Sequence, residues 1–124
     1  MSKKLIYVLE DDPDINEVVV YILSEAGYEV NGCATVAQFG ELVSQKLPDI
    51  AILDIMLPDG NGLEVCMQLH KNEQTSAINV IMMSANRSKN EVEQMGCGVA
   101  FIAKPFNIDD FVTQVNLFGR ASYN

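Results

Sequence analysis

Short runs of apolar residues alternate with amphipathic stretches along this chain, and this alternation is the feature that most constrains its fold. Continuous apolar runs are typical of strands that are covered on both faces. The alternation therefore predicts an α/β fold, a doubly wound five-stranded parallel sheet with helices on both faces. The expected strands cover residues 5–9, 28–33, 50–53, 78–83 and 99–103.

Five helices are expected in the stretches between and after these runs. Asp12 is expected to cap the first helix, with Pro13 at its first position, while Thr35 caps the second and Asn107 the last. The stretch 86–98 has few apolar residues, so a helix there is expected to be short or irregular. Residues at helical spacing that are expected to face the sheet are Ile15, Val18, Val19, Ile22 and Leu23 in the first helix, and Ile108, Phe111, Val112, Val115 and Phe118 in the last.

Length and charge narrow the class of protein. The chain has 124 residues, enough for one domain with a substantial core, and residues 1–124 are expected to form a single domain. Its net charge of −9 argues against direct binding to nucleic acid or to an anionic membrane, because both need basic patches.

The amino terminus and the cysteines indicate a compartment. The apolar run after Lys4 is too short for a signal peptide or a membrane span, so a cytoplasmic protein is expected. Cys33, Cys66 and Cys97 are widely spaced and are expected to be free, mostly buried thiols. A zinc site is disfavoured, because His70 is the only histidine and three or four ligands are needed.

Polar and charged residues stand at the ends of four predicted strands. Glu10, Asp11 and Asp12 follow the first strand and Asp54 the third. Ser84 and Lys104 follow the fourth and fifth strands. Because the carboxyl ends of parallel strands meet at one edge of a sheet, these groups are expected to converge there.

That set of groups suits phosphoryl chemistry on a metal. Clustered carboxylates favour a hard cation such as Mg²⁺, and a carboxylate can attack phosphorus to give an aspartyl phosphate. A lysine and a hydroxyl can stabilise charge on the transferred group. Each residue alone has a plainer interpretation: Asp12 as a helix cap, Asp54 as a turn former, and Lys104 as a surface charge.

The chain resembles the receiver domain of two-component response regulators over essentially its whole length. The matching stretches are, in order, "VLEDDPDI", "PDIAILDIMLPDGNGLEV", "VIMMSA" and "AKPF". The resemblance implies a flavodoxin-like strand order, 2-1-3-4-5. It also implies that Asp54 accepts a phosphoryl group, with Ser84 as the switch hydroxyl and Lys104 as the basic partner of the phosphate.

The same resemblance implies a magnesium site and a switch. Mg²⁺ would be held by Glu10, Asp11, Asp54 and the backbone carbonyl of Met56, with Asp11 the direct ligand of the acidic pair and Glu10 acting through water. Phe101 matches an aromatic switch position, although it lacks the hydroxyl of the more usual tyrosine. We hypothesise that the apolar Met56 side chain hinders an attacking water and gives a long-lived phosphoryl state.

The resemblance also implies partners. The donor would be a histidine kinase or a histidine phosphotransfer protein, and the receiver would catalyse only its own phosphorylation and dephosphorylation. Phosphorylation would alter the surface of the fourth helix, fifth strand and fifth helix. That surface would bind a downstream effector or an output domain outside this sequence, or form a phosphorylation-dependent dimer.

Two other classes remain as alternatives. A Mg²⁺-dependent phosphohydrolase could also use an aspartyl phosphate, but it would need a second acid and a substrate-binding cap. A flavodoxin-like nucleotide binder would need a loop that binds phosphate after the first strand, where three acids would instead repel it. Multiple turnover of a phosphate ester would favour the first alternative, and a bound yellow flavin the second.

Overall fold

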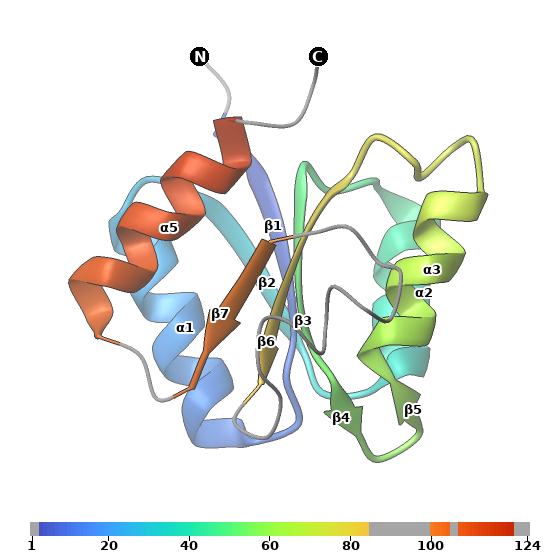
Figure 1. Cartoon of the computed structure of the whole chain (residues 1–124), viewed down its shortest axis with the longest axis horizontal. Coiled ribbons are helices and arrows are strands. Elements are labelled where there is room, and N and C mark those ends of the chain that lie inside the picture. Colours follow the sequence, from blue (N-terminus) through green and yellow to red (C-terminus); the bar gives the residue numbers. More distant parts are fainter. Residues whose placement is uncertain (1–2, 85–99, 105–106, 121–124) are drawn as a thin grey trace.

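The computed structural model describes residues 3–84, 100–104 and 107–120 (Figure 1). Five parallel strands form the central sheet in the order β2-β1-β3-β6-β7, which confirms the predicted 2-1-3-4-5 topology. A two-stranded antiparallel hairpin, β4–β5, lies outside this sheet. The strands are β1 (Leu5–Leu9), β2 (Glu29–Cys33), β3 (Ile50–Asp54), β4 (Met56–Leu57), β5 (Gly60–Asn61), β6 (Asn79–Ser84) and β7 (Ala100–Ala103).

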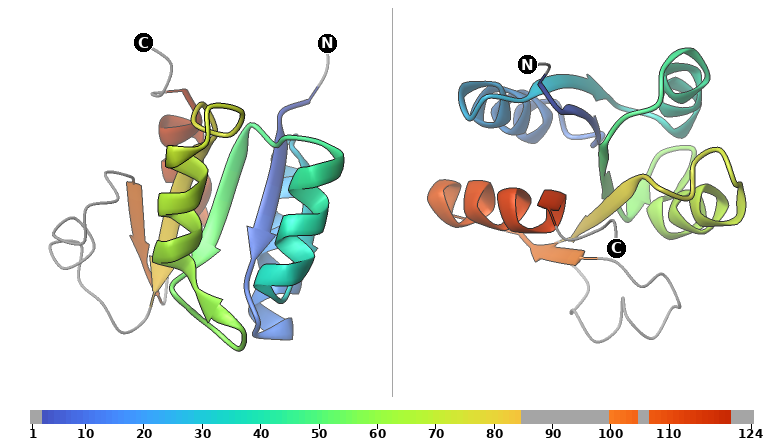
Figure 2. Two further views of the ribbon diagram at one scale, coloured as in Figure 1. Left: turned by 90° about the vertical axis from the view of Figure 1, so that its right-hand side faces the viewer. Right: turned by 90° about the horizontal axis from the view of Figure 1, so that it is seen from above.

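Helices cover both faces of the sheet. Helices α1 and α5 lie on one face, and α2 and α3 lie on the other (Figures 1 and 2). Their bounds are α1 (Pro13–Glu25), α2 (Val36–Gln45), α3 (Gly62–Lys71) and α5 (Ile108–Arg120). The helix expected at 86–98 falls outside the described residues. None of the helices that the structure describes is long and apolar enough to cross a membrane.

The three predicted helix caps are confirmed. Asp12 Oδ1 accepts from the backbone N–H of Asp14 at 2.9 Å, and Thr35 Oγ1 accepts from that of Gln38 at 3.1 Å. Asn107 Oδ1 accepts from the N–H of Asp109 at 2.9 Å. Each cap satisfies a donor that has no partner inside its own helix, so the helix starts could be recognised from local sequence.

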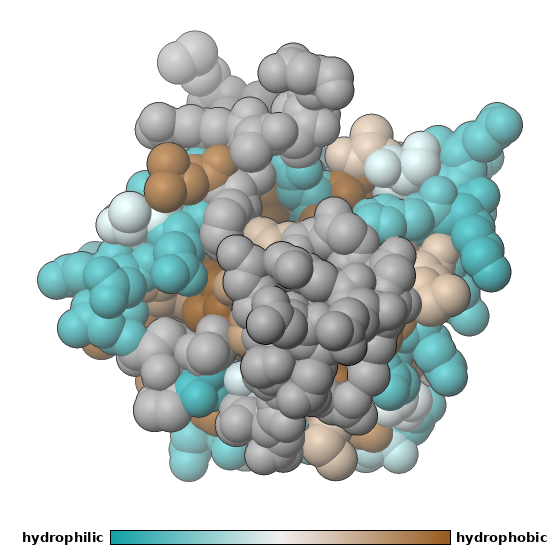
Figure 3. All heavy atoms as spheres, viewed as in Figure 1, coloured by the Kyte–Doolittle hydropathy of each residue, from teal (hydrophilic) through white to brown (hydrophobic). Residues whose placement is uncertain are grey.

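The strands separate the core into two layers. Successive side chains of a strand point to opposite faces, so Tyr7 and Leu9 pack with α2 and α3, while Ile6 and Val8 pack with α1 and α5. Both faces of the central strands are therefore buried, as the continuous apolar runs predict. In Figure 3 the hydrophilic side chains gather at the two sides of the view, over the outer surfaces of the helical layers.

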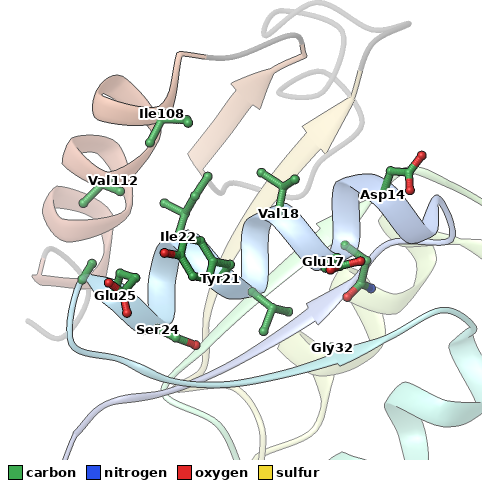
Figure 4. A pocket seen from close by; sticks show the side chains of 13 residues that line it. Asp14, Glu17, Val18, Tyr21, Ile22, Ser24, Glu25, Gly32, Ile108 and Val112 are labelled. Carbon is green, nitrogen blue, oxygen red and sulfur yellow. The ribbon is translucent and has the colours of Figure 1, made fainter.

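Two residues of the expected helix faces do not pack in the core. Val18 is 47% exposed and Ile108 is 55% exposed. Both line an open groove of about 1330 Å³ between α1 and α5, in which Ile22 and Val112 also lie (Figure 4). Helical spacing defines an apolar arc, but only the packing of α1 against α5 decides how far that arc is covered.

Candidate functional site

The polar residues at the strand ends meet at one edge of the sheet, as predicted. Glu10 follows β1, Asp54 ends β3 and Ser84 ends β6, and all three are buried, with Glu10 only 1% exposed. Lys104 follows β7, where its backbone N–H donates to the carbonyl of Ser84 at 3.0 Å. This edge lies at the lower end of the sheet in Figure 1.

Lys104 joins two of these strand ends electrostatically. Its ammonium Nζ forms an ion pair with Glu10 Oε1 and lies 3.1 Å from Asp54 Oδ2. Burial acts to lower the pKa of Lys104, but the hydrogen bonds to Glu10 and Asp54 outweigh burial, so that its pKa is raised. This ammonium is therefore held charged between two carboxylates.

The pKa of the Glu10 carboxyl is raised in this arrangement. Burial raises its pKa to about 7, although the hydrogen bonds from Lys104 and from the backbone N–H of Asp12 act to lower it and the neighbouring Asp54 adds to the rise. Carboxylates thus outnumber the ammonium around Glu10, whose side chain is almost fully buried. A second cation beside them would lower the cost of keeping every carboxylate ionised.

The residues present fit a hard divalent cation. Glu10, Asp11 and Asp54 each offer a carboxylate oxygen, and these oxygens all lie within 4.8 Å of one another. Mg²⁺ is usually held by one or two carboxylates together with several waters and phosphate oxygens, and this cluster can supply those carboxylates. Asp11 is exposed, so water can reach the cluster from its side. A hollow of about 330 Å³ beside Glu10 and Asp11 opens toward α1 and the start of α2.

Met56 and Phe101, the two other residues expected to take part in the site, lie on β4 and β7. Met56 starts β4, two residues beyond Asp54, and is 60% exposed. Phe101 is partly buried on β7, where it pairs with Met82 and packs against the core layer of α2 and α3. The Lys104–Pro105 bond, expected to be cis, involves a residue outside the described ranges.

Asn16, which the sequence does not mark as a site residue, holds the acidic segment in place through two hydrogen bonds. Its Nδ2 donates to the carbonyl of Glu10 at 2.9 Å and to that of Cys33 at 3.0 Å, so it links the ends of β1 and β2. Gly32 makes room for it, because a Cβ at that position would lie 2.2 Å from Asn16 Oδ1. Only the polarity of Asn16, one turn after the Asp12 cap, signalled it in the sequence.

Gly62 was also missed as a site residue, although it lies in the predicted turn. A Cβ there would lie 2.0 Å from the carbonyl oxygen of Asp54. Its N–H donates to the carbonyl of Ile55 at 2.8 Å. The chain thus closes tightly on itself around the end of β3, and only glycine permits that approach.

The prediction of free cysteines is partly wrong. Cys33 is a free, buried thiol that donates to the carbonyl of Val8 at 3.4 Å, and burial raises its pKa to about 12. Cys66, in contrast, is disulfide-bonded. Wide spacing in sequence does not prevent a disulfide, because the fold brings distant residues together. Cys97 lies outside the described residues.

Comparisons with known proteins agree with this geometry. Residues 6–116 match the family model of the response regulator receiver domain. The chain is 31% identical over 117 residues to the DNA-binding dual master transcriptional regulator RpaA of Synechocystis, covering 93% of this chain and 48% of that protein. It is 30% identical over 117 residues to the phosphate regulon transcriptional regulatory protein PhoB of Pseudomonas aeruginosa, covering 93% of this chain and 51% of PhoB.

A solved structure gives the same answer for the fold. The CheY-like response regulator receiver domain protein from Methanospirillum hungatei superimposes with a TM-score of 0.85 at 30% identity, covering 95% of this chain and 94% of that one. The chain spans about half the length of the curated relatives it matches. With strand order, site geometry and family model in agreement, the chain belongs to the receiver-domain family of two-component response regulators.

Proposed function

We propose that Asp54 accepts a phosphoryl group from a phosphohistidine on a histidine kinase or a histidine phosphotransfer protein. A carboxylate oxygen of Asp54 forms the new P–O bond, the P–N bond to the imidazole breaks, and its electron pair stays on the imidazole nitrogen. The observation that carries this proposal is the placement of Asp54, buried at the end of β3, with the Lys104 ammonium 3.1 Å from its Oδ2.

The neighbouring groups would assist that transfer. Glu10, Asp11, Asp54 and the backbone carbonyl of Met56 would hold Mg²⁺, which when bound supplies positive charge to offset that of the phosphoryl oxygens. The ammonium of Lys104, which follows β7, offsets the negative charge of the Asp54 carboxylate. Ser84, buried at the end of β6, would donate a hydrogen bond from its hydroxyl to the phosphoryl group.

The signal would leave through the surface that includes β7 and α5. Movement of Ser84 toward the phosphate would draw the partly buried Phe101 further inward and alter that surface. Two matched relatives are named as transcriptional regulators, so an output domain or a separate effector is the proposed recipient. A dimer formed on phosphorylation is the other assembly expected.

The proposed role is that of a switch that reacts only at its own Asp54, in the cytoplasm. An enzyme acting on free substrates would turn over a phosphate ester many times. A receiver instead forms one covalent adduct and loses it slowly. The two roles are distinguished by turnover, because a phosphohydrolase releases many phosphates per protein molecule in the time during which the switch holds one phosphoryl group.

Intact-mass measurement tests the proposal. The wild type, Asp54→Asn and the control Glu41→Gln, an exposed acid on α2, are incubated with a small acyl-phosphate donor with and without Mg²⁺. We expect one phosphate adduct on the wild type and on Glu41→Gln, only with Mg²⁺, and none on Asp54→Asn. An adduct on Asp54→Asn, or none on the wild type, would overturn the proposal.

A further inference from the structure

The side-chain amide of Asn16, in the first turn of α1, bridges the ends of two neighbouring strands. Its Nδ2 donates to the carbonyl of Glu10, the residue after β1, at 2.9 Å, and to the carbonyl of Cys33, the last residue of β2, at 3.0 Å. The same Cys33 carbonyl accepts from the backbone N–H of Glu10 at 3.0 Å. The peptide groups on both sides of Glu10 are therefore attached to the end of β2, one directly and the other through Asn16.

The residues between Glu10 and Asn16 are fixed by hydrogen bonds of their own. The backbone N–H of Asn16 donates to the Asp12 carbonyl at 2.9 Å, and the Asp12 carboxylate caps α1 through the N–H of Asp14. The N–H of Asp12 in turn donates to Glu10 Oε2 at 3.1 Å. Asp11 thus lies between two residues whose positions are set by the end of β1 and the start of α1.

Gly32 provides the space that the bridge needs. A Cβ at this position would lie 2.2 Å from Asn16 Oδ1 and 3.1 Å from Val20 Cγ2. Because Oδ1 is at the end of a side chain, a larger residue at position 32 would be accommodated by rotation of Asn16, and that rotation would break both of its hydrogen bonds. Glycine inside a strand weakens the strand and often marks a close approach by another group, and here that group is the Asn16 amide.

The bridged segment carries two of the three clustered carboxylates. Glu10, Asp11 and Asp54 each have a carboxylate oxygen within 4.8 Å of the other two. Their mutual repulsion acts to push the segment after β1 away from the end of β3. Because Asp11 is exposed, its carboxylate is directed mainly by the backbone from which it extends. The bridge through Asn16 opposes the repulsion by holding that backbone.

The two common divalent cations differ in how much they depend on such a constraint. Mg²⁺ requires near-ideal octahedral geometry with oxygen ligands at about 2.0–2.1 Å, whereas Ca²⁺ accepts variable geometry at about 2.3–2.6 Å. A loosened acidic segment can therefore adapt to Ca²⁺ more easily than to Mg²⁺.

We propose that Asn16 is a positioning residue of the cation site: by tying the Glu10 carbonyl to the end of β2, it holds the carboxylates of Glu10 and Asp11 in the compact arrangement that Mg²⁺ requires, and so favours Mg²⁺ over Ca²⁺. The inference rests on the part of the proposed function in which these carboxylates hold Mg²⁺. It assigns Asn16 no bond to the cation.

Cation titrations of the unphosphorylated protein test this. Wild type, Asn16→Ala and the control Ser24→Ala, an exposed residue near the other end of α1, are titrated with Mg²⁺ and separately with Ca²⁺ in ¹H–¹⁵N NMR spectra. We expect Asn16→Ala to weaken Mg²⁺ binding about tenfold, because groups that hold metal ligands in place have effects of that size. Ca²⁺ binding should weaken by a smaller factor, and Ser24→Ala should match the wild type. Alanine is the better helix former, so α1 itself should not be weakened, and the dispersion of the spectra checks the fold.

A double-mutant cycle with Gly32→Ala separates the bridge from other effects. Gly32→Ala should also weaken Mg²⁺ binding, and adding it to Asn16→Ala should have little further effect, because both remove the same bridge. Wild-type Mg²⁺ affinity in Asn16→Ala, equal weakening of Mg²⁺ and Ca²⁺ binding, or multiplied effects of the two substitutions would overturn the inference.

Adduct formation gives a second measurement. At low Mg²⁺ the acyl-phosphate donor should modify Asn16→Ala more slowly than the wild type, and saturating Mg²⁺ should restore the rate. A rate that stays low at saturating Mg²⁺ would overturn the inference, because the defect would then lie outside cation binding. A wild type that binds Mg²⁺ but forms no adduct at Asp54 would overturn the proposed function and leave the role of Asn16 standing.

Discussion

The close approach of Gly62 to the backbone of Asp54 allows the effect of Gly62→Ala on stability to be predicted. A Cβ at residue 62 would lie 2.0 Å from the Asp54 carbonyl oxygen and 2.9 Å from its carbon, whereas ordinary contacts are 3.4–4 Å. Both atoms belong to the backbone, so no side-chain rotation relieves the clash. In a close-packed interior the end of β3 or the start of α3 must then move by more than about 1 Å. We expect Gly62→Ala to cost about 3 kcal/mol in the free energy of unfolding.

Gly40→Ala is the matched control, because Gly40 lies within α2 and a Cβ there would have no atom within 4 Å. That substitution should stabilise the protein by about 0.5–1 kcal/mol, since alanine is the better helix former. Urea unfolding followed by circular dichroism measures both variants. The displaced Asp54 should also form its adduct about tenfold more slowly in Gly62→Ala. A Gly62→Ala variant as stable and as quickly phosphorylated as the wild type would refute the reasoning.

Three further predictions concern the two ends of the sheet. Lys104→Met should slow adduct formation at Asp54 by about ten- to a hundredfold, measured by intact mass, because it removes the positive charge nearest the acceptor. Tyr7→Phe should cost about 1 kcal/mol in urea unfolding, without changing adduct formation, because it removes a 2.7 Å hydrogen bond to the Lys46 carbonyl at the far end of α2. In EDTA the free energy of unfolding should fall as pH rises from about 4.5 to about 7, because the raised pKa of Glu10 makes the folded state bind more protons than the unfolded state across that range. Mg²⁺ should oppose that fall, and a stability in EDTA that rises over the same range would contradict it.

The sequence predicted those parts of the fold that depend on local signals. The caps at Asp12, Thr35 and Asn107 use side chains that act on N–H groups two or three residues away, so a few neighbouring letters define them. The strand order and the placement of Asp54 and Lys104 followed from the family resemblance and from the rule that parallel strands end at one edge.

The remaining features depend on approaches between distant segments, which periodicity does not encode. Asn16 reaches Cys33 only because β1 and β2 are neighbours, and Asp59 reaches Val36 only because the hairpin folds back toward α2. The two-residue strands of that hairpin are too short to show an alternating pattern, so the sequence predicts the segment only as a turn. Helical spacing predicts Val18 to be in the core for a related reason, since spacing alone does not reveal an open groove.

Three adjacent acids after β1 are tolerated because the fold gives each a different environment. Glu10 points into the site, where the Lys104 ammonium neutralises it, and its Oε2 accepts from the N–H of Asp12 at 3.1 Å. Asp12 turns the other way and caps α1. Asp11, between them, is exposed, and a carboxylate oxygen of Asp11 lies within 4.8 Å of those of Glu10 and Asp54. Neutralising the carboxylates of Glu10, Asp11 and Asp54 would require more positive charge than Lys104 supplies. The excess of negative charge favours binding of a divalent cation at the place where the phosphoryl group is expected.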